Sequence, residues 1–278
     1  MRCSRSAGPR EPDLSLFSFA RSKKFAPAIP RGYRAYAIGD IHGRLDLLDA
    51  LLADIERDMA ARPRCRTILV FLGDLIDRGS RSRDVVERLR TYRLPRVKCV
   101  FLAGNHEEVL LRILGGEHGI LESWLTFGGA ECLKSYGVDP LAIRSMSEAR
   151  GIEAIRKAFP PAHLKFLGGF ADTLRLGDYL FVHAGIRPGL DLALQNQSDL
   201  RWIRSAFLDD EADHGFVVVH GHTISNEVVE RPNRIGIDTG AYRTGVLTAL
   251  GLEGSDRWFI ATRGEMAPGS AENAAALI

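Results

Sequence analysis

Three short polar runs, each flanked by glycine and each directly following an apolar stretch, recur at nearly equal intervals in the first half of the chain. The apolar stretches read as buried strands because they are short, continuous and rich in β-branched and aromatic residues. Polar groups that end successive buried strands meet at one edge of a sheet, so this pattern constrains the fold more than any other. The runs are Gly39-Asp40-Ile41-His42-Gly43, Gly73-Asp74-Leu75-Ile76-Asp77-Arg78-Gly79 and Gly104-Asn105-His106-Glu107.

Helical segments separate these first strands. Apolar residues at helical spacing predict a helix over 45–59, and two more are expected over 82–92 and from near His106. Strands and helices that alternate in this way form parallel sheets whose following loops carry chemistry at one edge. The strands themselves are expected at 35–38, 67–72 and 97–102.

The second half of the chain has a different organisation. Glycine and proline pairs interrupt short helical stretches in residues 115–168, which predicts a helical insertion covering one side of the site. We expect the later strands to form a second, more antiparallel sheet. The predicted fold class is therefore α/β, with two mixed sheets packed face to face and flanked by helices. The later strands are expected at 170–176, 179–183, 216–220, 235–238, 246–252 and 258–262.

The charge of the chain is unevenly distributed. Residues 1–34 hold eight of the 37 basic residues but two of the 35 acidic residues, so the remainder is mildly acidic. We predict a basic flexible leader over residues 1–32, either a solvated tail or a weak electrostatic contact for a partner or an anionic surface. Residues 33–265 are predicted to form the catalytic domain, and 266–278 a C-terminal tail. An acidic body argues against a nucleic-acid partner.

Neither the cysteines nor the apolar runs suggest a secreted or membrane protein. The four cysteines form no Cys-x-x-Cys pair, so a reducing compartment is expected. No apolar run approaches the roughly 18 residues of a membrane helix, and the N-terminus lacks a secretory apolar segment. We expect a cytoplasmic protein without membrane contact. The sequence leaves the oligomeric state open.

The three runs offer metal ligands. Asp40 and His42, two residues apart at a strand end, can hold one cation through carboxylate oxygen and imidazole nitrogen. Asp74 is the natural bridging carboxylate, because two neighbouring cations repel and need an anion between them. Asn105 can supply a neutral oxygen to a second cation. Each residue alone has an ordinary alternative as a turn former, cap or surface group, and only the set favours metal binding.

The second cation needs further ligands, and histidines end two of the later strands. His183 follows one such strand, and His220 and His222 follow another. We assign His183 and His222 as ligands. His220 can take the place of His222, since residues two apart in a strand share a face. A buried core histidine is the ordinary alternative for each.

Three groups remain for the substrate once the metals have ligands. Arg78 can bind phosphate oxygens in bidentate fashion. His106 is close enough in sequence to Asn105 to protonate a leaving alkoxide. Asp77 can hold the imidazolium of His106 and raise its pKa, which keeps the acid available.

A further arginine is expected to face the phosphate from the second sheet. Arg204 is our choice. Trp202, two residues earlier, is expected to be buried, and Arg201 is expected to be a solvated or structural charge.

Taken together, these motifs resemble those of the phosphoprotein phosphatase family of binuclear metallophosphoesterases, over roughly residues 34–250. The resemblance also rests on Val182-His183-Ala184-Gly185 and Gly221-His222-Thr223. It implies an αββα sandwich and two divalent metal ions, most simply manganese, with iron or zinc as alternatives. The implied ligands are Asp40, His42 and Asp74 for one metal and Asp74, Asn105, His183 and His222 for the other; the implied phosphate-binding residues are Arg78 and Arg204, and the proton donor is the His106–Asp77 pair.

One segment departs from the family pattern. The eukaryotic branch carries a Ser-Ala-Pro-Asn-Tyr type segment where this chain has Asp238-Thr239-Gly240-Ala241-Tyr242. Tyr242 can take the place of the equivalent tyrosine beside the phosphate. The chain thus looks like a bacterial-type member, a branch in which protein phosphatases and diadenosine tetraphosphate hydrolases are close relatives. The Asp77-Arg78-Gly79 and Glu107 forms look like those of the protein phosphatases.

The function predicted from the sequence is metal-dependent phosphomonoester hydrolysis by direct attack of a metal-bridging hydroxide. A protein serine/threonine phosphatase acting on a phosphorylated protein is the leading hypothesis. A diadenosine tetraphosphate hydrolase, or another hydrolase of small phosphoesters, is the alternative. A non-catalytic binding module is disfavoured, because no expected ligand is missing. The insertion at 115–168 is where we expect substrate choice to lie.

Overall fold

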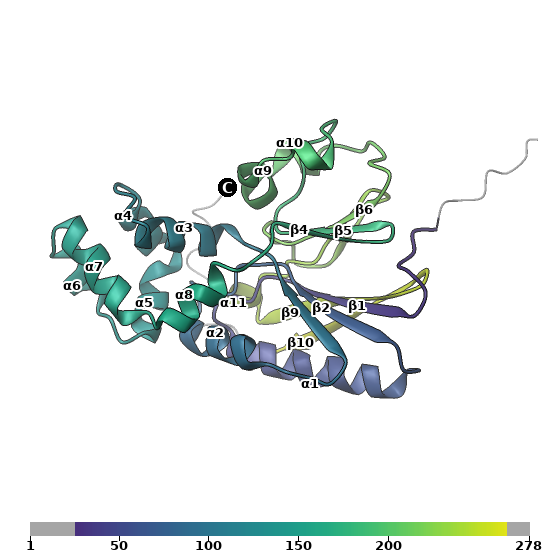
Figure 1. Ribbon diagram of the computed structural model, residues 1–278, viewed down its shortest axis with the longest axis horizontal. Helices are drawn as coiled ribbons and strands as arrows, with labels where there is room; N and C mark the ends of the chain where they lie inside the picture. The colour runs from purple at the N-terminus through teal and green to yellow at the C-terminus, as the bar shows by residue number, and fades with distance from the viewer. Residues whose placement is uncertain (1–25, 266–278) are drawn as a thin grey trace, which may run out of the picture.

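Two five-stranded sheets pack face to face at the centre of the computed structural model, which describes residues 26–265 (Figure 1). The strand order is β10-β9-β1-β2-β3 in the first sheet and β4-β5-β6-β8-β7 in the second. Both sheets are mixed and helices cover their outer faces, which confirms the predicted fold class.

The elements keep the predicted alternation with small shifts at their ends. The strands are β1 (Tyr33–Ile38), β2 (Arg66–Phe71), β3 (Val97–Phe101), β4 (Thr173–Leu176), β5 (Tyr179–Val182), β6 (Val217–His220), β7 (Val229–Glu230), β8 (Arg234–Gly236), β9 (Val246–Glu253) and β10 (Asp256–Arg263). The α-helices are α1 (Leu45–Ala61), α2 (Ser82–Thr91), α3 (Asn105–Leu114), α4 (Leu121–Trp124), α5 (Ala130–Ser135), α6 (Pro140–Arg144), α7 (Glu148–Ala158), α8 (Pro161–Leu167), α9 (Gln197–Trp202), α10 (Ser205–Leu208) and α11 (Ala241–Thr244). A π-helical turn, η1 (Leu125–Gly129), joins α4 to α5, and a 3₁₀ turn, η2 (Leu192–Leu194), precedes α9.

The first sheet corrects one prediction. Its β1, β2 and β3 are parallel, as expected. However, β9 pairs with β1, and β10 pairs with β9, both in antiparallel fashion. The prediction that these late strands belong to the second sheet was therefore wrong. The pairing of β1 with β2 leaves the other edge of β1 open, and the apolar β9 closes it. The second sheet keeps β5, β6 and β8 parallel and carries antiparallel strands only at its edges.

Three apolar clusters hold these layers together. The inner one fills the space between the sheets, with Ala37 and Val70 facing Phe181 and Val219. The outer one joins the first sheet to α1 and to the helical insertion, and the third joins the second sheet to α9 and α10. Each helix buries one apolar face in this way. Every Å² of apolar surface removed from water stabilises the fold by about 25 cal/mol. The polar groups are therefore found in the loops at the carboxyl ends of the strands.

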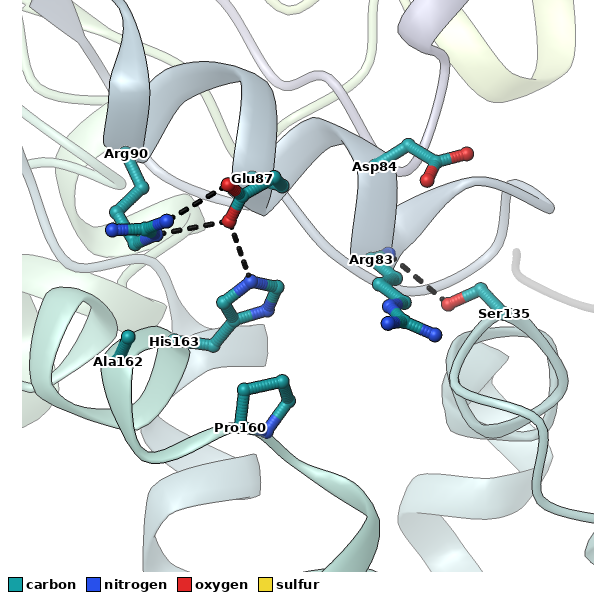
Figure 2. A pocket seen from close by; sticks show the side chains of 8 residues that line it. All are labelled: Arg83, Asp84, Glu87, Arg90, Ser135, Pro160, Ala162 and His163. Carbon is teal, nitrogen blue, oxygen red and sulfur yellow. Dashed lines mark hydrogen bonds and ion pairs between the residues drawn. The ribbon is translucent and has the colours of Figure 1, made fainter.

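The helices from α4 to α8 occupy the predicted insertion and extend from one end of the molecule (Figure 1). The buried His163 of α8 ties them to α2, since its ring nitrogens lie 2.9 Å from Tyr136 Oη and 3.0 Å from Glu87 Oε2. His163 and Glu87 line a surface pocket of about 430 Å³, together with Arg83 and Arg90 (Figure 2). The insertion is therefore a packed part of the domain.

The ends of the described region bear on two predictions. Residues 1–25 of the predicted leader and the predicted tail at 266–278 lie outside the described residues. Ile29 is buried, and its backbone N–H donates to the Gly254 carbonyl at 2.9 Å, so the last residues of the predicted leader pack on the body. Within residues 26–265, no helix has the length and apolar character needed to cross a membrane.

Candidate active site

The loops after β1, β2, β3, β5 and β6 bring the predicted polar residues together around Asp74. Both His42 Nε2 and His183 Nε2 lie 3.5 Å from Asp74 Oδ2. Asn105 Oδ1 lies 3.0 Å from His183 Nε2 and 3.0 Å from His222 Nδ1. Asp74 therefore belongs to two buried donor groups at once, one with His42 and His106 and the other with His183 and His222.

The backbone is bent sharply at these positions. Six non-glycine residues of the described region have φ in the left-handed region, where a Cβ is disfavoured, and five of them belong to the site. Such conformations cost on the order of 1–3 kcal/mol each and persist where the surrounding structure enforces them. The strained backbone conformations therefore occur in the same loops that the glycine-flanked polar motifs of the sequence indicated. The five residues are His42, Asp74, Asp77, Arg78 and His222.

Hydrogen bonds fix the orientation of the histidine rings. His42 Nδ1 donates to the Ile76 carbonyl and His183 Nδ1 donates to the Leu72 carbonyl, both at 2.8 Å. Each ring consequently directs the lone pair of Nε2 toward Asp74. Burial lowers the pKa of His42 well below its ordinary value and that of His222 to about 2, so these rings are neutral at pH 7. Neutral imidazole is the form that binds metals.

Several carboxylates of the site are buried close to one another. Asp40 lies between the backbone N–H of His222, which donates to its Oδ2 at 3.0 Å, and the carboxyl of Asp238. Asp40 Oδ1 and His222 Nε2 are buried without a partner. Burial raises the pKa of Asp40, that of Glu107 to about 7 and that of Asp238 to about 6.

This crowding of unpaired acidic groups with neutral imidazoles is the chemistry of a cation site. The donor set thus fits two divalent cations that share Asp74. Asp238 was not predicted as a site residue, although it also follows a buried strand and stands two residues before a glycine, a weaker form of the signal that revealed the other three runs.

Two arginines flank this centre. The guanidinium of Arg78 donates to Tyr242 Oη, lies 4.6 Å from the centre of the Tyr242 ring and lies 3.3 Å from His106 Nε2. Its position is set by the π-helical turn, because its backbone N–H donates to the Gly128 carbonyl at 3.0 Å and a Cβ on Gly128 would stand 2.6 Å from Arg78 Cγ. Arg204 is exposed, and it lies near enough to His222 for its positive charge to contribute to the lowered pKa of that ring.

His106 differs from the other imidazoles of the site in its partner. Its Nδ1 lies 2.7 Å from Asp77 Oδ2, and the same oxygen accepts a hydrogen bond from Trp124 Nε1 at 2.8 Å. Burial opposes the charged form, but Asp74 and Asp77 outweigh it and raise the pKa of His106. His106 therefore keeps its proton to a higher pH than the neighbouring rings do, which distinguishes a proton donor from the candidate metal ligands. The contact from Trp124 was not predicted.

Comparison with known proteins gives the family. The model of the calcineurin-like phosphoesterase family matches residues 33–247. The chain belongs to the calcineurin-like phosphoesterases. The predicted resemblance to binuclear metallophosphoesterases is confirmed at this level, and so is the chemical class: the protein is a phosphoesterase of the hydrolase class.

Two proteins similar to this phosphoesterase are named as bis(5'-nucleosyl)-tetraphosphatases. The chain is 29% identical over 232 residues to the asymmetrical bis(5'-nucleosyl)-tetraphosphatase PrpE of Anoxybacillus flavithermus, a match that covers 77% of this chain and 88% of that protein. It is 43% identical over 81 residues to the symmetrical bis(5'-nucleosyl)-tetraphosphatase of Yersinia enterocolitica, but this covers 29% of this chain and only 25% of that protein.

Solved structures agree in fold. A structure named provisionally as a diadenosine tetraphosphatase superposes with a TM-score of 0.59 and 19% identity, covering 87% of this chain and 100% of that one. A point mutant of a cold-active protein tyrosine phosphatase superposes with a TM-score of 0.53 and 16% identity, covering 86% of this chain and 83% of that one. At these identities the likeness concerns the fold alone.

Three further sequence expectations are resolved by the fold of the phosphoesterase. His220 does not join the site: its ring packs 5.2 Å from Phe207, because the left-handed His222 ends the strand alternation that would have placed both rings together. Trp202 is 39% exposed, so the prediction that it is buried was wrong; it ends α9 at the rim of the site. Arg201 is a structural charge, paired with Asp172 and Glu108.

Glu107 holds the loops that follow β2 and β3 through hydrogen bonds. Its carboxylate accepts backbone N–H groups from Gly104, Asp74 and Leu75 at 3.1, 2.9 and 2.8 Å. Replacing Glu107 by Gln turns one acceptor into a donor that faces buried N–H groups. We expect the free energy of unfolding in urea to fall by at least about 2 kcal/mol. Replacing the exposed Glu153 by Gln is the control and is expected to leave it unchanged, because exposed pairs contribute little. Equal stability of the two variants would contradict a supporting role.

Proposed function

We propose that this phosphoesterase hydrolyses the phosphoanhydride chain of dinucleoside polyphosphates such as diadenosine tetraphosphate. The observation that carries the proposal is the relative named as a bis(5'-nucleosyl)-tetraphosphatase, because the match extends over most of both chains. The two buried donor groups that share Asp74 support hydrolytic activity in this chain.

The proposed metal ligands fall into two groups that share one residue. Asp40, His42 and Asp74 would hold one divalent cation, and Asp74, Asn105, His183 and His222 would hold the other. Manganese is our choice, with iron or zinc as alternatives, because carboxylate, imidazole and amide donors suit all three. When bound, the two cations polarise the phosphoryl oxygens and make water a strong nucleophile.

The remaining residues act on the substrate. Arg78 and Arg204 neutralise charge on the phosphoryl oxygens. Tyr242 holds the guanidinium of Arg78 in place through its hydroxyl and its ring. His106 donates a proton to the leaving oxygen, with Asp77 holding its ring. No cysteine or serine nucleophile is needed, so no phosphoenzyme should form.

A substrate panel tests the proposal. Manganese-reconstituted protein is assayed on diadenosine tetraphosphate and on a phosphoserine peptide, with product nucleotides resolved by ion-exchange chromatography. We expect kcat/KM for diadenosine tetraphosphate to exceed that for the peptide by at least about 10-fold, or roughly 1.4 kcal/mol in transition-state binding. The Asp74→Asn variant, purified in parallel, reports any contaminating phosphatase. A preference for the phosphopeptide would overturn the proposal.

A protein serine/threonine phosphatase is the second candidate. Two features of the sequence favour it: the Asp77-Arg78-Gly79 form of the second run, and Glu107 after the histidine of the third. Both look like the protein phosphatases of the phosphoprotein phosphatase family. The same panel decides between the candidates, since they share the metal ligands and differ in what lies beyond the phosphate.

A further inference from the structure

Two large aromatic side chains are exposed on elements that contact residues of the candidate site. Phe127 is 54% exposed and Trp202 is 39% exposed. Isolated exposed apolar residues are common on protein surfaces and need no function. These two differ from the others because each is tied to a residue of the site, Trp202 through its own ring next to His222 and Phe127 through the neighbouring Gly128, which contacts Arg78.

Trp202 is held next to the second group of proposed metal ligands. Its ring lies 6.4 Å from the ring of His222 at an interplanar angle of 76°. Its Nε1 donates to Glu108 Oε2 at 3.3 Å, and Glu108 stands in the first turn of α3, beside His106. Because the ring N–H already has a partner, the exposed part of Trp202 offers an aromatic surface.

Phe127 is held next to the phosphate-binding side. It lies in the π-helical turn η1, directly before Gly128, the residue whose carbonyl accepts the backbone N–H of Arg78. The next glycine of the same turn packs on Trp124, which donates to Asp77. The turn that positions the arginine and the acid–base pair thus presents an aromatic ring to solvent.

The arrangement matches the shape of the proposed substrate. A dinucleoside polyphosphate has a charged chain with a planar base at each end, and stacking on an aromatic ring accepts any base. We propose that Trp202 and Phe127 each stack on one base of the substrate while its phosphate chain lies at the Asp74 centre between them. This inference rests on the proposed function. Trp202 and Phe127 would be the residues that distinguish a nucleotide from a phosphate compound without bases.

Conservative and non-conservative substitutions test the inference. The variants are Trp202→Leu, Trp202→Phe and Phe127→Leu, with Phe259→Leu as a control at an exposed aromatic residue of β10. The substrates are diadenosine tetraphosphate and inorganic tetraphosphate, which has the same chain without bases. The measured quantity is the ratio of kcat/KM between the two substrates.

We expect Trp202→Leu and Phe127→Leu to lower this ratio by about 5- to 100-fold each, the range for losing one base–aromatic stack. Trp202→Phe keeps an aromatic face but loses the hydrogen bond to Glu108, and it should retain the ratio within about threefold of the wild-type value. Phe259→Leu should not change the ratio.

Three outcomes would overturn the inference. If the wild-type protein turns over diadenosine tetraphosphate but the leucine variants keep its ratio, stacking fails while the proposed function stands. If both substrates lose activity equally, the aromatic residues have a structural role only. If the wild-type protein does not hydrolyse diadenosine tetraphosphate, the proposed function fails and the inference fails with it.

Discussion

Replacing Asp74 by Asn is expected to abolish metal-dependent hydrolysis, with a loss of roughly 1000-fold or more. Asp74 is common to both donor groups of the site, and its carboxylate faces His42 and His183 at the same distance of 3.5 Å. A neutral amide cannot offset the repulsion between two cations, and the charge stabilisation they provide amounts to several kcal/mol. The measurements are turnover and bound metal by inductively coupled plasma mass spectrometry.

The matched control for this variant is Asp84→Asn, which removes an exposed carboxylate paired with Arg81. Its activity and metal content should equal those of the wild-type protein. If the Asp74→Asn variant also bound two metals and kept near wild-type turnover, the bridging role would be refuted.

Replacing His106 by Asn is expected to slow hydrolysis in proportion to how poor the leaving group is. Its Nδ1 lies 2.7 Å from Asp77, and the charges of Asp74 and Asp77 raise its pKa, so the proton remains available at higher pH than on a free imidazole. Loss of a general acid costs roughly 100-fold or more when the departing oxygen is a basic alkoxide. An activated aryl phosphate needs little protonation and should lose much less.

The measurement is a series of phosphate esters of graded leaving-group basicity, assayed with the wild-type protein and the variant. His118→Asn is the control, because this histidine is exposed on the insertion and pairs only with Glu148 among the described residues. A uniform loss across the series would argue against proton donation and for a role in holding Arg78 or the metals.

Local sequence patterns predicted the elements better than their pairing. The run of apolar residues in β9 correctly indicated a strand, and the spacing in α1 correctly gave its buried face. The assignment of β9 and β10 to the second sheet was wrong. Periodicity reports which side of a strand is buried, whereas the choice of neighbour depends on which edge remains open after earlier strands have paired.

The candidate site was predictable where one local rule applied. A polar residue after a buried strand and within two residues of a glycine identified Asp40, Asp74, Asn105 and His183, and the structure brings all of them together. The rule does not reach residues placed by tertiary packing. Trp124 contacts Asp77 from a helix 47 residues away in sequence, and nothing in its local sequence marks it.

The exposure of Trp202 has the same origin. As the last residue of α9 it is apolar enough to be expected in a core, but α9 ends at the rim of the site and its Nε1 bonds to Glu108 of another helix. The burial of Trp202 thus depends on where α9 ends relative to α3. The local sequence around Trp202 does not encode this.

The most direct test of a two-metal centre shared through Asp74 is anomalous diffraction from crystals of the manganese-loaded phosphoesterase. We predict two anomalous peaks about 3.5–4 Å apart, both within coordination distance of Asp74, one beside His42 and the other beside His183 and His222. A single peak, or peaks away from Asp74, would contradict the account.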